Sequence, residues 1–213
     1  MGARRESLRL CLVTDRSFLR GTSLSDVVAA AVRGGVTSVQ LREKTLDIVA
    51  FAELGRAIKE LLLPLGVPLI INDHAEVAAA VGADGLHVGQ SDLPAEAARA
   101  LLGRNATIGL SITAIEQLRK PDVRFADYLG VGPIFATPTK PDAAEAMGLK
   151  GLAAARSMSA LPMVAIGGIS QANAAETMAA GANGVAVVSA IMGAADPEQA
   201  ARALARAVGV TSA

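Results

Sequence analysis

The sequence has very few aromatic residues, one cysteine and no net charge, and each of these features narrows the class of protein. Phe, Trp and Tyr make up 2% of the 213 residues, although 52% are hydrophobic. The apolar content is therefore mainly Ala, Val, Leu and Ile, which is typical of parallel strands buried on both faces. Lys and Arg total 20, as do Asp and Glu, so no overall field attracts nucleic acid or an anionic membrane. Any charge that binds an anionic ligand must be local.

With Cys11 as the only cysteine, no internal disulfide can form, and a reducing cytoplasm is the simplest compartment. Cys11 lies in an apolar run, where we expect a buried spacer. We also expect no secretory signal and no membrane span, because no apolar run approaches about 20 residues. Two histidines are too few for a usual zinc site. We expect His87 to be a satisfied core residue and His74 to start a helix.

Short apolar runs alternate with longer helical patterns along the whole chain. We expect strands at 8–13, 38–41, 69–71, 85–87, 107–109, 128–130, 163–166 and 184–187. We expect helices at 25–33, 48–63, 75–81, 95–102, 115–118, 151–158, 171–179 and 197–208. This alternation predicts a parallel sheet of the α/β class. No glycine-rich dinucleotide loop follows the first run, so we favour a closed single-domain (β/α)8 TIM barrel over residues 1–213.

The second strand leads into a polar segment with a clear alternation. Gln40, Arg42 and Lys44 share one parity, while Val39 and Leu41 take the other. The period of two predicts that the three polar side chains point to one side and the two apolar ones toward the helices. Two cations are costly in a packed core but useful above an anionic ligand. An exposed basic turn is the alternative interpretation.

Carboxylates follow the next two strands. Asn72 and Asp73 end the third run, and Gln90 and Asp92 follow the fourth. The carboxyl ends of parallel strands meet at one edge, so we expect these groups to lie close together. Mg²⁺ usually takes one or two protein carboxylates and completes its shell with water and phosphate oxygens. Either aspartate alone could instead cap a helix. Their shared location beside Arg and Lys favours a Mg²⁺ site.

The longest irregular segment, GVGPIFATPTKPDAAEAMGLKG, follows the sixth run. Long loops in compact domains are often lids or binding loops. Within it, Thr137, Thr139 and Lys140 offer two hydroxyl groups and a cation to an oxyanion. A solvated loop without function is the alternative.

The ends of the seventh and eighth strands carry a second phosphate signal. Barrels commonly bind phosphate there through backbone N–H groups near a short helix. Gly167 and Gly168 follow the seventh run and lack side chains that would block such an approach, and Val188 and Ser189 follow the eighth. Many barrels share this feature, so it predicts a phosphorylated ligand and no particular reaction.

Taken in order, several segments resemble those of the thiamine-phosphate synthase (thiamine-phosphate pyrophosphorylase) family. The segments are LVTD, QLREK, IIND, GADGLHVGQSDLP, IGLS, ADYLGVGPIFATPTK and VAIGGI. The likeness runs from about Leu12 to Ile191, and QLREK, IIND, GQSD and TPTK are together specific. The resemblance implies a TIM-barrel transferase that joins 4-amino-5-hydroxymethyl-2-methylpyrimidine diphosphate to 4-methyl-5-(2-hydroxyethyl)thiazole phosphate. The products would be thiamine phosphate and diphosphate.

The resemblance also implies roles for individual residues. Asp73 and Asp92 would hold Mg²⁺, and the catalytic cations at the diphosphate would be Arg42, Lys44 and Lys140. The implied substrate-binding set is completed by Gln40 at the pyrimidine, Asn72 and Ser111 at the diphosphate, Thr137 and Thr139 at the thiazole phosphate, and Gly168, Val188 and Ser189 as backbone anchors. The chain departs from the family where an aromatic residue is common at position 11 and Arg at position 74.

Two other functions stay open at this point. A thiazole tautomerase of a related branch binds only the thiazole phosphate, so it would need neither the paired carboxylates nor the Arg–Lys pair. A non-catalytic phosphate-ligand sensor would keep only the phosphate site at the ends of the seventh and eighth strands. The presence of both groups favours the transferase. We expect small-molecule substrates as partners, no nucleic acid and no membrane, and we leave a homo-oligomer open.

Overall fold

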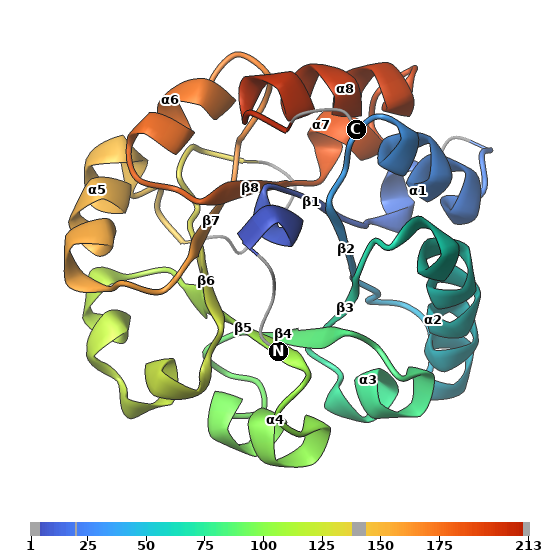
Figure 1. Ribbon diagram of the computed structural model, residues 1–213, viewed down its shortest axis with the longest axis horizontal. Coiled ribbons are helices and arrows are strands. Elements are labelled where there is room, and N and C mark those ends of the chain that lie inside the picture. The colour runs from blue at the N-terminus through green and yellow to red at the C-terminus, as the bar shows by residue number, and fades with distance from the viewer. Residues whose placement is uncertain (1–4, 20, 138–143, 211–213) are drawn as a thin grey trace.

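A computed structural model describes residues 5–19, 21–137 and 144–210, with the side chain of residue 5 left out. The described chain forms a closed barrel of parallel strands in which each strand pairs with the next and β8 pairs with β1. The strands are β1 (Leu10–Val13), β2 (Ser38–Leu41), β3 (Leu69–Asn72), β4 (Gly85–Val88), β5 (Thr107–Ile112), β6 (Tyr128–Val131), β7 (Met163–Ile166) and β8 (Gly184–Val187). Figure 1 shows the strands as a central ring with the α-helices outside it. The predicted TIM barrel is confirmed.

The α-helices follow the strands in turn. They are α1 (Leu24–Arg33), α2 (Ile48–Leu62), α3 (Ala75–Val81), α4 (Ala95–Leu102), α5 (Gly148–Met158), α6 (Ala174–Ala179), α7 (Ser189–Met192) and α8 (Pro197–Ala207). The short 3-10 helices are η1 (Arg5–Leu8), η2 (Arg16–Phe18), η3 (Leu63–Leu65), η4 (Ile115–Arg119) and η5 (Pro121–Phe125). No helix within these described ranges is long and apolar enough to cross a membrane.

The helix expected at 115–118 is present as the 3-10 helix η4 rather than as an α-helix, and a second 3-10 helix, η5, follows it before β6. Pro121 explains the break: it has no backbone N–H to continue a helix, and it disfavours helical geometry in the residue before it. Lys120 accordingly has extended backbone angles, with φ −68° and ψ 143°. Another difference concerns β5, which continues to Ile112 rather than ending at 109, so Ser111 lies on the strand itself.

Side chains alternate between two packing layers along each strand. Leu10 and Leu12 of β1 belong to the large core between strands and helices, whereas Cys11 and Val13 point into a smaller cluster inside the barrel. Tyr128, Val164, Ala186 and Leu8 complete that inner cluster. These inner residues do not fill the barrel completely. A cavity of about 1460 Å³ remains, and residues at both ends of the strands line it.

Candidate active site

The polar residues that follow the strands gather around this one cavity. The predicted site residues that line it are Gln40, Arg42, Lys44, Asn72, Asp73, Asp92, Ser111, Thr137, Gly168, Val188 and Ser189. Thr139 and Lys140 were predicted with them but lie outside the described residues. Residues that are separated by up to about two-thirds of the sequence thus lie together at one rim, as expected where parallel strands end together.

The first part of the rim is formed by β2 and the turn after it. Gln40 is buried in the barrel and Arg42 and Lys44 line the cavity, while Val39 and Leu41 pack in the outer core. Arg42 donates from its guanidinium to Asp15 Oδ2 at 3.1 Å. Its backbone N–H also donates to the hydroxyl oxygen of the buried Thr14 at 3.0 Å. The turns after β1 and β2 are therefore tied together beneath the Arg42 side chain.

Glu43, which the sequence analysis did not single out, holds the same turn from inside. Its Oε1 accepts from the Lys44 and Thr45 backbone N–H groups at 2.7 and 2.9 Å and from the Thr45 hydroxyl at 2.9 Å. Its Oε2 forms an ion pair with Arg16 at 3.2 Å. Burial acts to raise the pKa of Glu43, but the hydrogen bonds from Thr45, Lys44 and Arg16 outweigh it and hold the pKa below its ordinary value. Glu43 is thus an ionised centre of the turn that carries both cations.

The next part of the rim contains the two carboxylates. Asp73 has a φ of 64°, and it is the only residue other than glycine with a positive φ in the described chain. Aspartate is one of the few residue types that adopt this region with some frequency. Asp73 pairs with Lys44 Nζ at 3.3 Å, and Asp92 Oδ2 accepts from the Gly89 N–H at 2.7 Å. His74 rather than Asp73 occupies the N-cap position of α3, as we expected for this histidine.

The two carboxylates are close enough to influence each other. Burial, and after it the neighbouring Asp92, raises the pKa of Asp73 above its ordinary value of 3.8, while Lys44 opposes the shift. No group of three or more His, Cys, Asp or Glu that could hold a metal occurs in the described ranges. Two repelling carboxylates beside a cavity nevertheless suit Mg²⁺, which takes hard oxygen ligands and fills its remaining positions with water and phosphate oxygens.

The opposite part of the rim is formed by β7, β8 and the segment after β6. Gly167 and Gly168 have φ values of 96° and 64°. A Cβ on Gly167 would lie 2.5 Å from Pro133, and one on Gly168 would lie 2.7 Å from the Ala136 carbonyl oxygen. Glycine is therefore required here by the close approach of the segment after β6, in addition to any ligand. Val188 precedes the short helix α7, whose first residue is Ser189.

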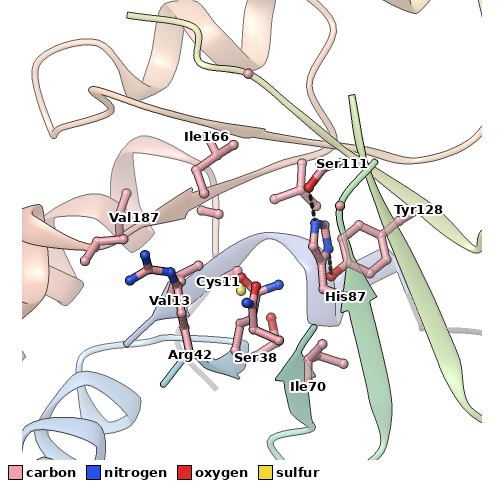
Figure 2. Close-up of a pocket in the computed structure, with 18 of the residues that line it drawn as sticks. Cys11, Val13, Ser38, Arg42, Ile70, His87, Ser111, Tyr128, Ile166 and Val187 are labelled. Atoms are coloured by element: carbon pink, nitrogen blue, oxygen red, sulfur yellow. Dashed lines mark hydrogen bonds between the residues drawn. The ribbon is translucent and has the colours of Figure 1, made fainter. Parts of the chain in front are cut away.

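A buried polar chain crosses the inner layer between these two parts of the rim. His87 of β4 lies with Nδ1 2.9 Å from the Tyr128 hydroxyl and Nε2 2.9 Å from Ser111 Oγ. Burial lowers the pKa of His87 to about 4 against the charge of Asp92, and burial raises the pKa of Tyr128 well above its ordinary value. Figure 2 shows Ser111 and Tyr128 on either side of the imidazole. The expectation of a satisfied core histidine is confirmed, and this histidine also lines the cavity.

Cys11 lies across the inner layer from this chain, near Ser38 (Figure 2). It is buried, as expected, and burial raises the pKa of its thiol to about 11.

Sequence reasoning did not single out Tyr128 as a site residue. The signal that could have found it is its position in the strand alternation. Tyr128 and Gly130 face inward and alternate with the outward Leu129, as the inward Cys11 alternates with the outward Leu12.

The closed barrel, and the polar residues gathered around its cavity at the carboxyl ends of the strands, place the protein among the TIM-barrel enzymes, which bind their substrates at that face. A family model described as thiamine monophosphate synthase matches residues 10–191. The chain belongs to this family, which confirms the resemblance noted in its sequence.

Individual relatives agree over nearly the whole chain. The thiamine-phosphate synthase of Syntrophomonas wolfei is 53% identical over 195 residues, which cover 92% of this chain and 93% of the relative. That of Albidiferax ferrireducens is 52% identical over 194 residues, covering 91% and 89%. The solved structure of a thiamine phosphate pyrophosphorylase from Pyrococcus furiosus has a TM-score of 0.88 at 35% identity and covers 96% of this chain and 97% of its own.

Proposed function

We propose that the protein is a transferase that couples hydroxymethylpyrimidine diphosphate to hydroxyethylthiazole phosphate, forming thiamine phosphate and diphosphate. The observation that carries the proposal is the gathering of Arg42, Lys44, Asp73 and Asp92 on one rim of the cavity. The likeness to named thiamine-phosphate synthases over more than nine-tenths of the chain supports it. We propose further that residues 1–213 act as one catalytic domain and that the reaction takes place in the cytoplasm.

The reaction needs charge stabilisation and alignment. The C–O bond between the pyrimidine methylene and the diphosphate breaks, the bonding electrons leave with the diphosphate, and the aminopyrimidine delocalises the resulting positive charge. The thiazole nitrogen then forms the new C–N bond with its lone pair. No proton has to be removed from the thiazole nitrogen, so the site requires no general base. Preorganised cations and a positioned nucleophile supply the catalysis.

At the diphosphate, the proposal assigns the stabilisation of developing charge to Arg42 and Lys44. Both are held by single carboxylates, Asp15 and Asp73, at distances of 3.1 and 3.3 Å. A diphosphate carries more charge than either carboxylate and can draw both cations toward the cavity. Asn72, Ser111 and Lys140 complete this assignment, with Lys140 resting on the sequence resemblance alone.

Mg²⁺ would be held by Asp73 and Asp92 and would neutralise part of the charge on the leaving diphosphate. Burial, and after it the neighbouring Asp92, raises the pKa of Asp73, and a bound cation would offset both effects by stabilising the ionised carboxylate, which supports this part of the proposal. Lys44, which pairs with Asp73 in the structure, would then be freed to contact a phosphate oxygen.

The organic parts of the substrates would lie deeper in the cavity and at its far side. Gln40, buried beneath Arg42, is assigned to the pyrimidine. The thiazole phosphate is assigned to Thr137 and Thr139 and to the backbone at Gly168, Val188 and Ser189.

Diphosphate release tests this function and separates it from the alternatives. Purified protein supplied with both substrates and Mg²⁺ is expected to release diphosphate and to form thiamine phosphate in equal amounts. Omitting either substrate should abolish both products. A protein that releases no diphosphate but isomerises the thiazole phosphate is a tautomerase. One that binds the thiazole phosphate and turns over neither substrate is a sensor.

A further inference from the structure

Three polar side chains on three neighbouring strands form a continuous chain inside the barrel. In the strand register, His87 of β4 is aligned with Gly109 of β5, and Gly109 is aligned with Tyr128 of β6. Ser111 lies two residues further along β5, on the same inner face, and is aligned with Gly130. The imidazole therefore stands between the phenol of one strand and the hydroxyl of another, as Figure 2 shows.

Two glycines make the space that this chain occupies. A Cβ on Gly109 would collide with both His87 Nδ1 and the ring of Tyr128, and a Cβ on Gly130 would lie 2.7 Å from His87 Cε1. The inner layer thus has two rings where most other inner positions have small or aliphatic side chains. Ser111, at the end of this row of hydrogen-bonded side chains, lines the cavity together with the cations of the rim.

The direction of the hydrogen bonds follows from counting donors and acceptors. A neutral imidazole has one N–H and one bare nitrogen, and the partner of one nitrogen decides the state of the other. Among the residues that the structure describes, the Tyr128 hydroxyl has a hydrogen bond only to His87 Nδ1. If Nδ1 carried the hydrogen, the buried phenol O–H would have no described acceptor, which is costly. The satisfied arrangement has Tyr128 donating to Nδ1 and Nε2–H donating to Ser111.

We propose that Tyr128 and His87 are positioning residues that fix the Ser111 hydroxyl as a hydrogen-bond donor to an anionic oxygen in the cavity. Because Ser111 Oγ accepts from Nε2–H, its own hydrogen must go to another acceptor. The reverse tautomer would let Ser111 donate to the ring instead, and an oxyanion would then face a lone pair. This inference rests on the proposed function for the identity of the oxyanion, a diphosphate oxygen, where a charge-assisted bond is strong.

The tautomer can be observed directly, because the chain has only two histidines. Histidine labelled with ¹⁵N gives signals from two rings, and a His74→Gln variant assigns them, because the one remaining ring then belongs to His87. The proposal expects His87 to show a bare Nδ1 and a protonated Nε2, both with and without Mg²⁺ and inorganic diphosphate. A protonated Nδ1 in the diphosphate-bound protein would overturn it.

A double-mutant cycle tests the consequence for binding, with inorganic diphosphate in the presence of Mg²⁺ as the probe. Ser111→Ala and His87→Leu are each expected to weaken diphosphate binding about tenfold. In the Ser111→Ala background, His87→Leu should weaken binding no further. Additive losses would mean that His87 does not act through Ser111 and would contradict the proposal.

Tyr128→Phe is the milder variant in case His87→Leu fails to fold. It keeps the ring in place and removes only the phenol oxygen, so we expect a mixed His87 tautomer and about threefold weaker diphosphate binding. An unchanged tautomer with unchanged affinity would overturn the role of Tyr128.

Failure of this inference is distinguishable from failure of the function. A wild-type enzyme that forms thiamine phosphate while the cycle is additive contradicts the inference alone, whereas an inactive wild type contradicts the proposed function.

Discussion

At the scale of single residues, the cavity is notable for charges that are held in pairs. Lys44 and Asp92 act on Asp73 in opposite directions, and Asp15 holds Arg42. Such arrangements are common where a protein prepares a site for a charged ligand, and they cost stability in the ligand-free state. This stability cost can be measured most clearly for the carboxylate pair Asp73 and Asp92.

Asp73→Asn should make the ligand-free protein slightly more stable and much less active. Asn is tolerated at positive φ, and the substitution removes the repulsion with Asp92, so we expect the free energy of unfolding to rise by about 1 kcal/mol or less. The raised pKa means that the ionised Asp73 costs stability above its titration range. The gain should therefore be present at neutral pH and vanish in acid, where Asp73 is protonated.

Urea unfolding at several pH values without Mg²⁺ measures this effect, and diphosphate release measures the activity. Glu53→Gln is the matched control, because it removes one exposed carboxylate of α2 away from the cavity. A destabilised Asp73→Asn protein, or one with normal activity at limiting Mg²⁺, would contradict the account.

Cys11 gives a second prediction at this scale. Its buried thiol, with a pKa of about 11, should not react with a thiol reagent at pH 8 in the native protein. In denaturant, one thiol per chain should react at once. Absorbance of the released chromophore measures both. Rapid labelling of the native protein would show that the inner layer is open to solvent at this position.

At the scale of elements, the turn after β2 depends on Glu43. We expect Glu43→Ala to raise the KM for the pyrimidine diphosphate about tenfold, because the turn loses four contacts and both cations lose their fixed positions. Glu43→Gln should be milder, since three of these contacts are to one oxygen that an amide retains. Steady-state kinetics at saturating thiazole phosphate measures the effect.

Arg16→Ala is the control for this prediction, because it removes only the ion pair to Oε2, and the Arg16 side chain is 43% exposed. Its effect on KM should stay within about threefold, as expected for a half-exposed pair. If Arg16→Ala is as damaging as Glu43→Ala, the ion pair rather than the turn is what matters.

A further prediction at this scale concerns β5, in the inner layer of the barrel. Gly109→Ala would place a methyl group against both His87 and Tyr128, so we expect a loss of about 1–3 kcal/mol in the free energy of unfolding. Gly55→Ala is the comparison, since its Cβ would meet only the Val81 side chain, at 3.1 Å, within a helix that favours alanine. Chemical denaturation should separate the two variants, and equal stabilities would mean that the rings move aside freely.

At the scale of the whole molecule, the barrel could be predicted from the sequence because its signals are local. Buried runs, helical patterns and the missing dinucleotide loop depend on neighbouring residues, and parallel strands that end together bring Arg42 and Asp92 to one rim. Contacts that depend on strand register could not be predicted. The pairs Arg42–Asp15, Glu43–Arg16 and His87–Tyr128 each join residues at least 27 positions apart. The expected fifth helix is a short 3-10 helix that ends before Pro121, which is a local effect.

The central claim is that one rim of the barrel holds both the metal and the diphosphate. A crystal structure with Mn²⁺, located by anomalous scattering, and inorganic diphosphate tests it most directly. The account predicts an ion in contact with Asp73 and Asp92, with the diphosphate oxygens against Arg42, Lys44 and Ser111. An ion elsewhere, or a diphosphate bound only between Gly168 and Ser189 at the ends of β7 and β8, would contradict it.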